Sequence, residues 1–112
     1  METKSDPEHS VIVYFNYGIQ GLEPLHKLEK KLEQLIKESN VGEYDGHEIA
    51  MDYSDGTLYM YGPDAYRLFN VIKPTLEEAE FMKGAKAVLC YSLPVEDTKE
   101  IVVEIDPEAG NG

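Results

Sequence analysis

The sequence predicts an α+β fold in which two helices pack on one face of an antiparallel sheet. Short runs of β-branched and aromatic residues alternate along the chain with stretches in which leucine and isoleucine recur at helical spacing. The dipeptide Asp55-Gly56 tolerates positive φ and separates two strand-like runs, which predicts a hairpin in the middle of the chain. A length of 112 residues suits one domain with a single core.

The first half of the chain predicts a strand and then an amphipathic helix. A β-branched and aromatic run predicts a strand over residues 11–15. The helix should cover residues 22–39, with Pro24 in its first turn and Asn40 as a left-handed residue at its end. Residues 42–46 are expected to form a loop. The apolar face of the helix consists of Leu25, Leu28, Leu32, Leu35 and Ile36.

The hairpin should join strands over residues 47–53 and 57–61 around Asp55-Gly56. Because strand side chains alternate between faces, Ile49 and Met51 are expected on one side. The other side of that strand should carry Glu48, Ala50 and Asp52.

A second helix should begin at Gly62-Pro63-Asp64, since proline suits a first turn and aspartate accepts hydrogen bonds from free N–H groups. Pro74 predicts a kink or a break into two short helices. Strands are expected over residues 86–91 and 100–105. The buried helix face consists of Ala65, Leu68, Phe69, Ile72 and Leu76.

The element order β-α-β-β-α-β with one added strand is the ferredoxin-like, split β-α-β pattern. It predicts the sheet order 4-1-3-2, with the fifth strand at the edge beside the fourth. Residues 1–9 should form a flexible leader, 10–105 the domain and 106–112 a flexible acidic tail. The predicted core includes Leu28, Leu32, Leu35, Leu68, Phe69, Ile72 and Val88.

The charge balance excludes several classes of function. Ten Lys plus Arg against 22 Asp plus Glu leave a net charge of −12, which repels phosphate and argues against nucleic-acid binding. No apolar run is long enough to span a membrane, and no secretory signal opens the chain. The single cysteine, Cys90, lies in an apolar run and is expected to be buried. These features predict a cytoplasmic protein.

Two helices cover only one face of the sheet, so the other face meets water, a partner or a second copy. Tyr14, Tyr59 and Tyr61 are placed on strands where some of them should lie on this open face. Tyrosine combines apolar area with a hydrogen-bonding tip, which suits a protein interface. We therefore expect a protein partner or a homodimer at this face. Cross-strand pairing of the tyrosines is the alternative interpretation.

Asp45, His47 and Asp64 form the nearest approach to an acid-base or ligand-binding group. His47 and Glu48 are strand neighbours and point to opposite faces, so they cannot share a metal ion unless a bulge intervenes. No cofactor, metal or catalytic motif is expected. His9 and His26 have no evident partner and should be solvated.

The runs 42–48 and 55–65, a helix ending near Gly84-Ala85 and a strand ending at Tyr91 together resemble small uncharacterised bacterial proteins of ferredoxin-like type. The resemblance covers roughly residues 10–105 and implies the same fold in a bacterial cytosolic protein. It implies no activity, cofactor or site residue.

Three functions are compatible with this sequence. The first is a non-enzymatic protein-interaction module. The second is an immunity-type or nucleic-acid-mimicking inhibitor of a basic partner, which the acidic charge favours. The third is a small ligand-binding domain or enzyme that uses the Asp45, His47 and Asp64 region.

Overall fold

Strands and helices follow one another along the chain in the predicted order. The computed structural model describes residues 9–92 and 98–105. In chain order its elements are β1 (His9–Asn16), α1 (Glu23–Ser39), β2 (Glu43–Ile49), β3 (Asp55–Gly62), α2 (Ala65–Glu78), the short 3-10 helix η1 (Glu80–Met82), β4 (Lys86–Ser92) and β5 (Thr98–Glu104). The leader and tail expected over residues 1–9 and 106–112 lie outside the described residues, except for His9, which begins β1.

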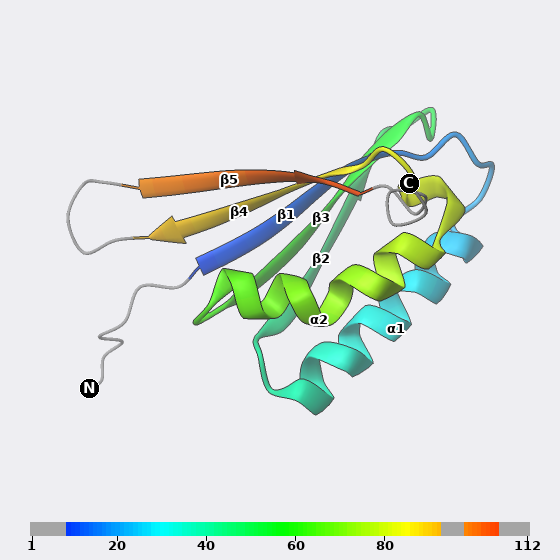
Figure 1. Ribbon diagram of the computed structural model, residues 1–112. Coiled ribbons are helices and arrows are strands. Elements are labelled where there is room, and N and C mark those ends of the chain that lie inside the picture. Colours follow the sequence, from blue (N-terminus) through cyan, green and yellow to red (C-terminus); the bar gives the residue numbers. More distant parts are fainter. Residues whose placement is uncertain (1–8, 93–97, 106–112) are drawn as a thin grey trace, which may run out of the picture.

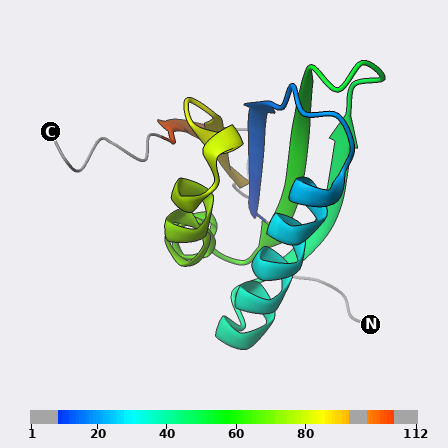
Figure 2. The same ribbon diagram turned by 90° about the vertical axis from the view of Figure 1, so that its right-hand side faces the viewer.

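The five strands form one antiparallel sheet in the order β2-β3-β1-β4-β5, which is the predicted order (Figure 1). Both helices lie on the same side of this sheet (Figure 2). α2 contacts β1, β3 and β4, whereas α1 contacts β2 and α2. The opposite face carries neither helix, and we call it the open face.

The core lies between the sheet and the helices because both contribute apolar side chains at the matching period. Val11 and Val13 of β1 are fully buried, as are Leu58 and Met60 of β3. The helices contribute the buried residues Leu25, Leu28, Leu32, Ile36, Ala65, Leu68, Phe69, Ile72 and Leu76. The predicted helix faces are therefore confirmed, except at Leu35, which is only partly buried.

The prediction that Val88 is a core residue was wrong. Ala87 and Leu89 of β4 face the helices and are buried, so Val88 between them lies on the open face and is partly exposed. Cys90 shares that face and is likewise only partly buried. A continuous apolar run carries no alternation, so it could not indicate which residues face the helices.

The hairpin turn lies before Asp55-Gly56 rather than at it. Residues 50–54 form the loop, in which the Ala50 N–H donates to the Asp55 carbonyl at 2.9 Å. Tyr53 takes the positive φ, at 63°. The carboxylate of Asp52 accepts a hydrogen bond from the Ser54 N–H at 3.0 Å, which stabilises the turn.

Gly56 is instead a packing requirement within β3. A Cβ atom there would lie 2.7 Å from the Phe15 ring and 2.5 Å from Cδ1 of Ile49. Only glycine lets these two side chains meet over the strand.

β2 begins at Glu43, so the loop expected over residues 42–46 is mostly strand. The register shifts between Tyr44 and Gly46, which makes Asp45 a bulge residue. A bulge interrupts the alternation by which strands are predicted. Met51, expected beside Ile49, is fully exposed in the hairpin loop.

Pro74 does not break the second helix. α2 runs as one helix from Ala65 to Glu78 with Pro74 inside it. At the N-terminus of α1, Pro24 occupies the first turn as predicted, and at its other end Asn40 takes the left-handed conformation with φ 55°.

Candidate functional site

An apolar row crosses the middle of the open face. Side chains of β1 alternate between faces, so Ile12 points away from the helices. The strand register places Tyr59, Ile12, Val88 and Val102 side by side across four strands, and we call them the apolar row. Val102 is 59% exposed. Tyr14 and Tyr61 flank the row on the same face, so all three tyrosines lie there, where the sequence predicted only that some of them would.

Acidic side chains flank both ends of the apolar row. Along the open face the strands carry Glu43, Glu48, Asp55, Glu100 and Glu104, and we call these residues the acidic rim. Lys86 is the basic residue that the described part of this face contributes. The Tyr59 hydroxyl donates to Oε1 of Glu48 at 2.9 Å, and this bond raises the pKa of Tyr59. The tyrosine is thereby oriented across the face towards the rim.

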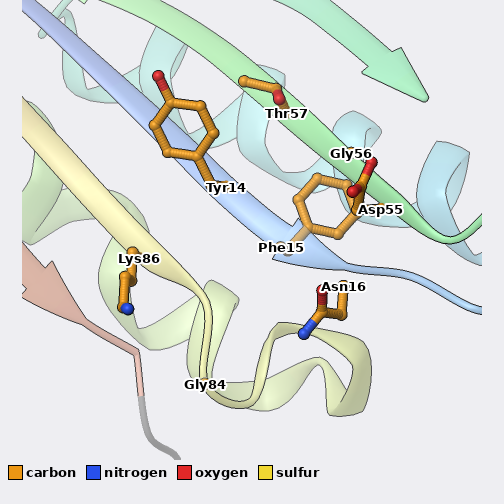
Figure 3. A pocket seen from close by; sticks show the side chains of 8 residues that line it. All are labelled: Tyr14, Phe15, Asn16, Asp55, Gly56, Thr57, Gly84 and Lys86. Carbon is orange, nitrogen blue, oxygen red and sulfur yellow. The ribbon is translucent and has the colours of Figure 1, made fainter. Parts of the chain in front are cut away.

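A shallow hollow of about 330 Å³ lies at one end of the open face (Figure 3). Its lining includes Tyr14, Asn16 and Phe15 of β1, Asp55 of β3 and Lys86 of β4. The polar ends of Tyr14, Asn16 and Lys86 point in different directions in Figure 3. The hollow therefore suits a protruding side chain of a partner better than a small ligand held by several polar groups at once.

A second group of polar residues joins α1 to β2 on the helix side of the sheet. One carboxylate oxygen of Glu29 accepts a hydrogen bond from the Tyr44 hydroxyl and lies 2.7 Å from Nδ1 of His47. The ring of His26 lies 6.1 Å from that of His47, centroid to centroid. His26 is exposed, as predicted, and the ring of His47 is a neighbour that the sequence did not indicate.

The environment of Tyr44 favours its neutral form. Burial raises the pKa of Tyr44 most, and the hydrogen bond to Glu29 and the charges of Glu29, Glu33 and Asp45 raise it further. A shared carboxylate that holds a phenol and an imidazole resembles the orienting part of an acid-base site. Here, however, the phenol of Tyr44 and the imidazole of His47 both contact the Glu29 carboxylate itself. The arrangement therefore connects α1 to the edge strand β2.

Asp64 and His9 serve the N-terminus of α2. The carboxylate of Asp64 accepts hydrogen bonds from the backbone N–H groups of Tyr66 and Arg67, at 3.1 and 3.3 Å. Nδ1 of His9 accepts from the Ala65 N–H at 3.0 Å, and its ring packs edge-on against Tyr91. The prediction that His9 is solvated was wrong.

The structure thus gives Asp45, His47 and Asp64 different surroundings. His47 contacts Glu29 on the helix side, Asp64 caps α2, and Asp45 is the exposed bulge residue of β2. Within residues 9–92 and 98–105, no three histidine, cysteine or acidic side chains gather in a way that could hold a metal ion.

None of the helices that the structure describes is both long and apolar enough to cross a membrane.

Sequence reasoning missed the contacts of Glu29 and the contribution of the last strands to the open face. Glu29 lies on the polar face of a helix, where a solvated glutamate is the usual interpretation. Val88 and Val102 join the apolar row only through strand pairing, which distant segments of the chain determine.

Searches with this chain found no matching family model, no matching curated protein and no matching solved structure.

Proposed function

We propose that this chain is a ferredoxin-like protein-interaction module whose open face binds a partner with an apolar patch bordered by basic residues. One observation carries the proposal: an apolar row with the acidic rim at both of its ends lies on a face that neither helix covers. Apolar centres with polar borders are typical of protein interfaces. The strand order and directions support the fold assignment.

The charge of the rim selects among possible occupants. A second copy would bring its acidic rim against this one, and each chain carries a net charge of −12. Like charges brought together at an interface cost several kcal/mol. Binding of nucleic acid is disfavoured for the same reason, because its phosphates carry the same sign of charge as the acidic rim. A basic protein surface gains from this field and is also steered towards it.

An inhibitor of a basic enzyme is the specific form of this function that the charge favours. Exposed tyrosines among carboxylates imitate the mixture of rings and anions that a nucleic-acid-binding enzyme recognises. The open face offers Tyr14 and Tyr59 among Glu48, Asp55 and Glu104. A single free thiol, Cys90, supports a reducing compartment such as the cytoplasm.

Site-specific photocrosslinking tests the proposal. A benzophenone amino acid is placed at Tyr14, which is 50% exposed on the open face, or at Tyr66, which is 63% exposed on α2. We expect a covalent adduct with a basic protein from position 14 and a much weaker one from position 66. Equal adducts from both positions, or an adduct only with a second copy of this chain, would reject the proposal.

The captured partner then allows a quantitative test. Tyr59→Ala and Tyr61→Ala should each weaken its binding by more than about 1 kcal/mol, because buried tyrosines carry much of the energy of an interface. Tyr66→Ala is the matched control and should leave the affinity unchanged.

A further inference from the structure

β5 is an edge of the sheet that no other described element except β4 contacts. It pairs with β4 on one side through seven consecutive residue pairs without a register shift. Neither helix contacts it, and in Figure 1 it lies at the margin of the sheet away from both. The other edge, β2, is interrupted by the bulge at Asp45. Bulges protect edges from pairing with other chains, and the described part of β5 has none.

The hydrogen bonds at the end of β5 show which backbone groups face outwards. The Ile105 N–H donates to the Ala85 carbonyl at 2.7 Å, so Ile105 faces β4. In an antiparallel pair this orientation alternates, and Val103 and Ile101 therefore face β4 as well. The N–H and C=O groups of Glu100, Val102 and Glu104 consequently point away from the sheet.

The side chains of this edge are apolar on one face and mixed on the other. Ile101 is 48% exposed on the helix side, where neither helix reaches it. On the open face Val102 continues the apolar row, with Glu100 and Glu104 two residues to either side. A strand laid against β5 would thus meet the order acid, apolar, acid on the open face and aliphatic residues on the other.

We propose that β5 binds an extended segment of the partner as a sixth strand. The segment carries an apolar residue opposite Val102 and lysine or arginine opposite Glu100 and Glu104, with aliphatic residues between them. Outward N–H and C=O groups supply the affinity of such strand addition, and alternate side chains supply its specificity. Opposite charges on directly paired strand residues favour this order further. The proposal rests on the proposed function in taking the partner to be basic.

A second copy of the chain fits this edge less well. Two β5 strands paired about Val102 would place Glu100 opposite Glu104 twice. Paired about Ile101, they would place Glu100 opposite Val102, a charge against an apolar side chain. Both arrangements lose the charge complementarity that a basic segment provides.

The acetylated and amidated peptide Ser-Lys-Ile-Val-Ile-Lys-Ser is the probe. We expect it to bind the wild-type protein below about 1 mM, within the range of a short strand-adding segment. Amide hydrogen exchange read by NMR should slow at Glu100, Val102 and Glu104. Exchange at Ile101 and Val103 should change little, because their N–H groups already pair with β4.

Three changes separate strand addition from simple charge attraction. Methylation of the central valine nitrogen of the peptide, which leaves the protein unaltered, should weaken binding about tenfold. Replacement of both lysines by glutamate should weaken it at least as much. Val102→Pro removes an outward N–H group that does not pair with β4. With this variant the peptide should no longer slow exchange at Glu104. Circular dichroism checks that the variant is folded.

The variant Tyr14→Ser distinguishes this inference from the proposed function. Tyr14 lies on the open face but on β1, away from the β5 edge. Tyr14→Ser should therefore weaken the binding of the partner protein and leave the binding of the peptide unchanged. Three results would each overturn strand addition. The first is equal binding of the N-methylated and unmodified peptides, and the second is no binding at about 1 mM. The third result is slowed exchange of the edge amides without peptide that increases with protein concentration.

Discussion

Gly56 is a single residue that the packing within β3 requires. It lies under the Phe15 ring and Ile49, with no room for a Cβ atom. We expect Gly56→Ala to lower the free energy of unfolding by about 1–3 kcal/mol, the usual cost of overpacking a core. Urea denaturation measures this change.

A double variant tests the cause of that loss. Ile49→Val removes the Cδ1 atom that lies 2.5 Å from the added methyl group. The combined variant should therefore lose less stability than the sum of the two single variants. Strict additivity would show that the contact with Ile49 does not explain the loss, which would then fall to the Phe15 ring, 2.7 Å from the added methyl group.

Tyr44 links the stability of the protein to alkaline pH. Burial and the carboxylate of Glu29 raise its pKa above the ordinary value near 10. The folded state then keeps its proton at a pH where the unfolded chain releases it, so the free energy of unfolding falls as pH rises above about 10. The contribution is fully present below that pH.

We expect Tyr44→Phe to flatten this decline, measured as urea midpoints from pH 9 to 11.5. The two proteins differ at residue 44 alone, so the difference between their two declines reports Tyr44. Tyr66→Phe is the control, because Tyr66 is 63% exposed. Parallel declines in wild type and Tyr44→Phe would contradict the assigned environment.

At the scale of the element, α2 depends on partners at its first turn. The carboxylate of Asp64 accepts hydrogen bonds from two backbone N–H groups, and His9, 56 residues earlier than Ala65, accepts one from a third. We expect Asp64→Ala to reduce stability by about 0.5–2 kcal/mol, the range for lost N-caps. Asp64→Asn keeps the acceptor and should cost less. Thermal unfolding of both variants decides between a cap and a binding role for this carboxylate.

The elements differ in how well sequence patterns predicted them. The faces of α1 and α2 followed from helical spacing, because burial against a sheet requires an apolar stripe. The start of β2 was predicted too far along the chain, because the bulge at Asp45 and the glycine after it break the alternation of side chains. The turn was misplaced because Gly56 can be required by packing as well as by positive φ.

At the scale of the whole molecule, the acidic charge governs association. We expect light scattering to give the monomer mass across a concentration series at physiological ionic strength, because two acidic rims repel each other. Salt shortens the Debye length from about 10 Å at 0.1 M to about 3 Å at 1 M, so any self-association should appear first at high salt. A dimer at low salt that Tyr59→Ala dissociates would show instead that the open face is a homodimer interface.

The sequence by itself determined the order of elements, the buried faces of the helices and the sign of the molecular charge. These properties depend on local periodicity and on composition, which need no knowledge of distant contacts. From the order of elements the rules of chain crossover also gave the order of the strands.

The tertiary structure alone decided which side chains meet. Val88 and Val102 extend the row of Ile12 and Tyr59 because pairing aligns segments up to 90 residues apart in number, from Ile12 to Val102. His47 binds Glu29 and not Asp64, because strand alternation turns it towards α1. Contacts of this kind depend on register and packing between elements, which no local window of the sequence contains.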